Sequence, residues 1–115
     1  MRVVAKLDGS KMPALLRLYI FYAPHRRMHR AVIQKYRDEL IRAMKEAGIH
    51  LPFTTTIDLW LEFIDPTSPD YDNLLTSLYQ ALDGKALKHG AKPVLFSDDG
   101  IVGTIRHMGM QVNVP

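Results

Sequence analysis

Two aspartates that stand two positions apart carry the strongest chemical signal in the chain. Asp70 and Asp72 lie within the run of residues 68–74, and a second acidic pair, Asp98 and Asp99, follows later. Carboxylate oxygens are the ligands that Mg²⁺ and Mn²⁺ prefer, because both are hard cations. If the later pair returns to the earlier one, three carboxylates form a candidate metal site.

The same aspartates have an ordinary structural explanation. Ser68 and Pro69 are residues typical of a helix start, and leucines recur after Asp72. An aspartate at a helix N-terminus accepts hydrogen bonds from free N–H groups, which stabilises the protein by about 0.5–2 kcal/mol. An Asp pair before Gly100 is equally typical of a turn. Both a helix cap and a metal ligand therefore stay open for these residues.

The charges of the chain are unevenly divided. Residues 1–50 contain 11 Lys or Arg and 4 Asp or Glu, whereas residues 51–115 contain 4 and 8, so +7 and −4 give the net +3. A basic surface that holds phosphates beside an acidic pocket that holds cations is typical of a metal nuclease. Charges paired across the surface of an ordinary protein explain the same division.

Composition excludes several kinds of chemistry. The chain of 115 residues has no cysteine, which excludes disulfides, thiolate zinc sites and cysteine nucleophiles. The length predicts a single domain over residues 1–115. Residues 1–11 contain four charged side chains and so lack the apolar segment of a signal peptide or membrane span. We therefore expect a cytoplasmic protein.

The pattern of apolar residues predicts an α/β (α+β) fold, with a small mixed sheet of about four strands and two main helices packed on it. Apolar residues three or four positions apart predict helices over about 28–47 and 69–82. Alternating or continuous apolar runs predict the strands. The expected strands cover residues 1–4, 15–22, 57–64 and 94–96, and then 101–108 and 111–114 as a final strand or hairpin broken at Gly109.

Basic residues gather before the first predicted helix. Arg26, Arg27 and Arg30 form a cluster that is a candidate phosphate contact, although solvation is the usual explanation of such residues. His25 and His29 stand four apart, a spacing that suits a transition metal if the segment is helical. A surface pair is the alternative, because no third ligand follows nearby.

The motifs of roughly residues 57–107 resemble those of the RusA family of phage and prophage Holliday junction resolvases. The resemblance rests on three short stretches and on the order of the elements before them, a strand, a basic helix and a strand. These stretches are Asp70-x-Asp72-Asn73-Leu74, Ala81-Leu82-Asp83-Gly84 and Asp98-Asp99-x-Ile101.

The resemblance implies a small α/β homodimer that binds four-way DNA junctions and cuts them with Mg²⁺ or Mn²⁺. Carried over, Asp70, Asp72 and Asp99 form the catalytic and metal-binding site, and Asn73 and Asp98 support these ligands. A bound cation would lower the pKa of a water molecule and neutralise charge on the leaving oxygen.

Two residues depart from the family pattern: Pro69 stands before Asp70 in place of a basic residue, and the departure at Thr76 matters more. Thr76 stands where the family usually has a lysine, on the helical face of the second aspartate, and a hydroxyl cannot replace that charge. Lys85 and Lys88 are candidate replacements and candidate DNA contacts, together with the three arginines. Two other functions therefore stay open: a non-catalytic module that binds junctions or a protein partner, and a dimeric structural protein whose aspartates are caps.

Overall fold

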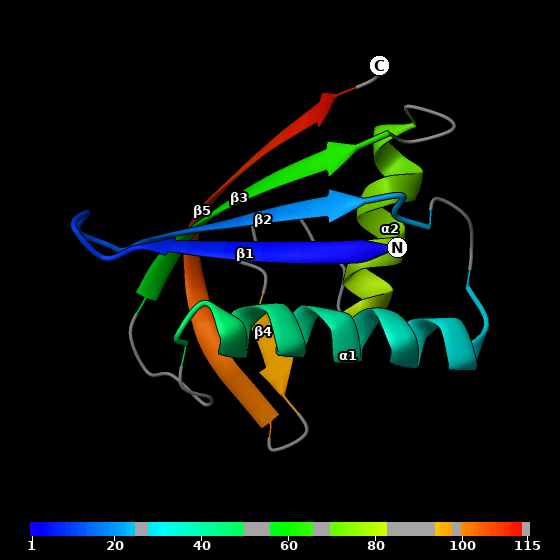
Figure 1. The fold of residues 1–115 in the computed structure, drawn as a ribbon, viewed down its shortest axis with the longest axis horizontal. Helices are drawn as coiled ribbons and strands as arrows, with labels where there is room; N and C mark the ends of the chain where they lie inside the picture. Colours follow the sequence, from blue (N-terminus) through cyan, green and yellow to red (C-terminus); the bar gives the residue numbers. More distant parts are fainter. Residues whose placement is uncertain (25–27, 50–55, 66–69, 83–93, 98–99, 114–115) are drawn as a thin grey trace.

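The computed structural model describes residues 1–24, 28–49, 56–65, 70–82, 94–97 and 100–113. These residues form one sheet and two helices (Figure 1). In chain order the elements are β1 (Arg2–Asp8), β2 (Leu15–Phe21), α1 (Arg30–Glu46), β3 (Thr56–Ile64), α2 (Tyr71–Ala81), β4 (Val94–Ser97) and β5 (Gly100–Asn113). In this part of the chain, neither helix is long and apolar enough to cross a membrane.

The sheet is mixed and has the strand order β1-β2-β3-β5-β4. The three middle strands, β2, β3 and β5, run parallel, and the edge strands β1 and β4 run antiparallel to their neighbours. This confirms the predicted α/β class, a mixed sheet with two helices, and the sheet has five strands where about four were expected.

One face of the sheet is buried by the two helices. Alternate residues of β2 and β3 point to this face, because successive side chains of a strand lie on opposite sides of a sheet. They include Leu16, Leu18, Leu61 and Phe63, each at most 1 % exposed. The helices contribute their own apolar stripes, and α1 also contacts β1 and α2. The buried helical side chains include Tyr36, Leu40, Met44, Leu74 and Leu78.

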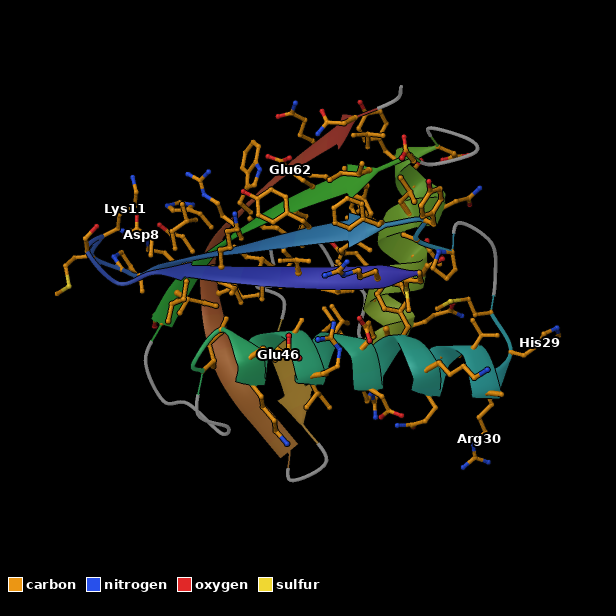
Figure 2. All side chains as sticks on the ribbon, in the orientation of Figure 1. Asp8, Lys11, His29, Arg30, Glu46 and Glu62 are labelled. Carbon is orange, nitrogen blue, oxygen red and sulfur yellow. The ribbon has the colours of Figure 1, made fainter. Side chains whose placement is uncertain are left out.

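The opposite face, which we name the open face, has no helix over it in the described part of the chain. Strand pairing places its side chains in rows across β1, β2, β3 and β5. Figure 2 shows Glu62 on the side of the sheet away from α1. The open face consists of Arg2, Val4, Lys6, Asp8, Leu15, Arg17, Tyr19, Phe21, Asp58, Trp60, Glu62, Ile64, Arg106, Gly109, Gln111 and Asn113.

Two predicted element boundaries were wrong. Strand β1 continues to Asp8, beyond the expected end at Val4, because every residue from Arg2 onward pairs with β2. Gly109 does not break the final strand, which is continuous from Gly100 to Asn113. Gly109 pairs with Trp60, and a Cβ atom at residue 109 would lie 2.5 Å from the indole ring. This glycine makes room for a side chain instead of ending a strand.

Candidate functional site

Asp70 caps the N-terminus of α2. Its Oδ1 accepts hydrogen bonds from the backbone N–H groups of Asp72 at 3.1 Å and Asn73 at 3.3 Å. The side chain of Asn73 donates from Nδ2 to Asp70 Oδ2 at 3.1 Å. The capping explanation of Asp70 is therefore confirmed, and Asn73 contacts it directly. A carboxylate offers about four acceptor positions, so these three bonds leave about one for a further ligand.

Asp72 lies in the first turn of α2 and is exposed. Within the described residues, its carboxylate makes no hydrogen bond or ion pair, in contrast to the carboxylate of Asp70. Asp72 thus presents a carboxylate that no described neighbour binds.

Thr76 lies one turn after Asp72 and is also exposed. Its hydroxyl donates a hydrogen bond to the backbone carbonyl oxygen of Asp72 at 2.7 Å. This local bond is a common use of threonine within a helix. The hydroxyl of Thr76 is therefore bonded to the helix itself.

The described residues do not show where the second acidic pair lies relative to α2. Asp98 and Asp99 lie outside them, but their neighbours Ser97 and Gly100 end β4 and begin β5. Thr104 of β5 pairs with Thr56 at the start of β3, so Gly100 lies at the opposite end of β3 from α2 (Figure 1). Because Asp98 and Asp99 themselves lie outside the described residues, their part in a three-aspartate site stays a prediction. The described residues contain no group of three His, Cys, Asp or Glu side chains that could hold a metal ion.

Only Arg30 of the predicted phosphate contacts lies in the described part of the chain. It begins α1 and is exposed, and Figure 2 shows its side chain directed away from the sheet. The neighbouring His29 is exposed at the N-cap position and makes no side-chain capping bond. The other predicted phosphate contacts and the second histidine lie outside the described part; they are Arg26, Arg27, Lys85, Lys88 and His25.

Two other basic residues of α1 have structural partners. Arg42 forms ion pairs with Glu39 and with Glu46, and it donates to the carbonyl oxygen of Val3 at 2.9 Å. Hydrogen bonding from Arg42 lowers the pKa of Glu39. Arg37 donates from Nε to the carbonyl oxygen of Ala81 at 3.0 Å, which joins α1 to the end of α2. The basic character of this helix therefore serves packing as well as solvation.

The sequence analysis missed a network of polar side chains on the open face. Glu62 accepts from Trp60 Nε1 at 3.0 Å and from Asn113 Nδ2 at 3.2 Å. Arg106 binds Asp58 with two hydrogen bonds of 3.0 and 2.9 Å and thereby lowers the pKa of that carboxyl. The sequence feature that could have revealed this network is the alternation in residues 57–64, which places Asp58, Trp60 and Glu62 on one side of a strand.

Comparisons with family models, curated proteins and solved structures found no match to this chain. The fold and the two sites define a mixed α/β protein with an acidic helix start and an open sheet face that carries rings and cations. The resemblance to the RusA family stays a prediction that rests on the motifs.

Proposed function

We propose that this protein is a metal-dependent endodeoxyribonuclease that resolves Holliday junctions or other branched DNA by hydrolysing phosphodiester bonds. The observation that supports it is the exposed carboxylate of Asp72 on the first turn of α2, beside Asp70 and without a partner in the described residues. Asp70 and Asp72 are the proposed ligands of Mg²⁺ or Mn²⁺, and Asp99 is the proposed third ligand.

The donor set fits a hard cation, because it consists of carboxylate oxygens at an exposed position. Asp70 is held in place by its bonds to the helix start and to Asn73, so one ligand is fixed before any ion binds. Asp72 is free to turn toward an ion. When bound, Mg²⁺ or Mn²⁺ would supply an activated water and stabilise charge on the leaving oxygen.

The proposed DNA contacts are Arg26, Arg27, Arg30, Lys85 and Lys88, of which Arg30 is exposed at the start of α1. Basic side chains neutralise phosphates and supply affinity that depends on salt. We propose a cytoplasmic homodimer as the active form, because a four-way junction presents two equivalent strands for cutting. A two-fold dimer matches that symmetry.

The test is cleavage of a labelled four-way junction by wild-type protein and by Asp72→Asn. We expect cleavage to fall about a hundredfold or more, because a neutral amide is a much poorer ligand for the cation. Junction binding should be retained or stronger, because the change removes negative charge near DNA. Asp38→Asn, at an exposed position of α1, is the matched control and should cut normally. Undiminished cutting by Asp72→Asn would overturn the proposal.

A second candidate function is favoured by Thr76. Its hydroxyl is bonded to the helix backbone and supplies no cation beside Asp72. A protein that binds junctions or a protein partner without cutting is consistent with this arrangement. Thr76→Lys separates the two functions: cleavage gained by this variant over a silent parent supports the binding module, whereas an active parent excludes it.

A further inference from the structure

The open face presents aromatic rings beside cations. Lys6 of β1 lies opposite Arg17 of β2, and Arg17 lies opposite Trp60 of β3. In the next row Tyr19 lies beside Lys6, whose ammonium group is 5.5 Å from the centre of the tyrosine ring. Neighbouring strands are about 4.8 Å apart, so one bound nucleotide can contact a ring and a cation on adjacent strands.

The indole of Trp60 is held in a fixed orientation. Its Nε1 donates to Glu62, and its six-membered ring lies over Gly109, whose missing side chain leaves the space. The side chain is partly exposed, because the open face has no helix over it in the described residues. A flat ring fixed against a sheet is a surface on which a nucleic-acid base can stack.

The charged side chains of the open face are four cations, Arg2, Lys6, Arg17 and Arg106, and three carboxylates, Asp8, Asp58 and Glu62, so +4 and −3 give a net charge of +1. Each carboxylate of the face accepts hydrogen bonds from a neighbour: Asp58 from Arg106, Glu62 from Trp60 and Asn113, and Asp8 from Ser10. In contrast, Arg2, Lys6 and Arg17 form no ion pair with any described residue. Arg2, Lys6 and Arg17, on the paired strands β1 and β2, therefore form a group of cations that complements an anion, and they would repel the same cations on a second copy of the chain.

We propose that the open face binds single-stranded DNA, with bases stacked on Trp60 and Tyr19 and phosphates held by Arg17, Lys6 and Arg2. Rings and cations recognise a single strand without reading its sequence. The amides and carboxylates of Glu62, Gln111 and Asn113 bond to one another and leave the rings and cations as the contacts. This site goes beyond the proposed nuclease, because it needs neither a metal ion nor the start of α2.

Trp60 reports on this binding directly, because it is the only tryptophan of the chain. Titrating the wild-type protein with oligothymidylate in chelator should quench its fluorescence to saturation, with an affinity that falls as salt rises. A duplex of the same length should quench it much less. No quenching by the single strand, or equal quenching by the duplex, would overturn the proposal.

Fluorescence anisotropy of a labelled oligothymidylate tests the named side chains. We expect Arg17→Glu and Trp60→Leu each to weaken binding about tenfold, since one removes a phosphate contact and the other a stacking ring. Leucine keeps an apolar side chain over Gly109. Lys35→Glu makes the same charge change at an exposed position of α1 and should bind normally. Equal weakening by Lys35→Glu would show that binding is only general charge attraction.

Two further outcomes are decisive. Sedimentation that shows a DNA-free dimer, converted to monomer by Arg17→Glu or Trp60→Leu, would assign the open face to a second copy and overturn the proposal. Asp72→Asn should bind the oligonucleotide as the wild type does. Loss of junction cutting with this binding intact therefore separates the failure of one proposal from the failure of the other.

Discussion

The two faces of the sheet are built from the same strands but from different chemistry. In β2, Leu16, Leu18 and Ile20 are at most 1 % exposed under the helices, whereas Arg17 and Tyr19 between them reach the open face. The covered face is aliphatic and aromatic without charge. The open face combines rings, amides, ion pairs and free cations.

This difference separates what holds the fold from what is available to a partner. Burying apolar area contributes about 25 cal/mol per Å², so the covered face supplies most of the stability. The open face keeps its side chains ordered through hydrogen bonds, such as those of Glu62, while it stays accessible. Substitutions on the two faces should therefore differ in their effect on folding.

The largest expected effect comes from a pair of leucines in one strand. Leu18→Ala on the covered face should lower the free energy of unfolding by about 2–5 kcal/mol, because it leaves a cavity in a packed core. Leu15→Ala on the half-exposed open face should cost about 1 kcal/mol or less. Urea denaturation of both variants measures this difference. Equal losses would show that another part of the molecule covers the open face.

Gly109→Ala should have the next largest effect. Its Cβ would lie 2.5 and 2.6 Å from two atoms of the Trp60 ring, so the indole must move and lose its bond to Glu62. We expect a loss of about 1–3 kcal/mol in the free energy of unfolding. Gly9→Ala, where nothing lies within 4 Å, is the control and should change stability by less than about 0.5 kcal/mol. A double-mutant cycle with Trp60→Leu should show coupling between the two positions.

A smaller effect is expected at the start of α2. Asp70→Ala should lower stability by about 0.5–2 kcal/mol, because two backbone N–H groups lose their acceptor. Asp72→Asn should change stability little, since its carboxylate bonds to no described residue. Thermal unfolding of the two variants tests this contrast. A stability loss in Asp72→Asn as large as that in Asp70→Ala would assign a structural role to both.

The smallest effect is a dependence on pH. Arg106 lowers the pKa of Asp58, so the ion pair stabilises the fold at neutral pH, and this contribution is lost as the pH falls through the lowered pKa. The Arg106→Gln variant lacks this ion pair, so it should unfold at a slightly higher pH than the wild type. Acid titration followed by circular dichroism measures this difference. The stability difference between the variant and the wild type should vanish at low pH; a constant difference would contradict the role of Asp58.

The periodicity of the sequence predicted both helices and the strands that carry the core. It failed at β1, because the alternation over Ala5, Lys6, Leu7 and Asp8 is short and was not recognised as a strand, although these residues pair with β2. It also failed at Gly109, whose role depends on Trp60 of a neighbouring strand. The pattern within one strand does not reveal either contact, since each depends on pairing with another strand: the next strand, β2, in one case and the distant β3 in the other.

The candidate site was predicted in part. The cap at Asp70 follows from local sequence, and the structure confirms it. The order of strands in the sheet determines where β5 begins relative to α2, and no local motif contains that order. To predict the open face, one must know the register between four strands, and sequence spacing alone does not fix that register.

The most direct test of the central claim is the binding of Mn²⁺ to the wild-type protein and to Asp72→Asn, measured by calorimetry. Asp72 is the best position because its replacement leaves the Asp70 cap intact. We predict saturable binding by the wild type that is at least about tenfold weaker in the variant, with unchanged stability. Equal binding by both proteins, or no saturable binding by either, would contradict a metal site at the start of α2.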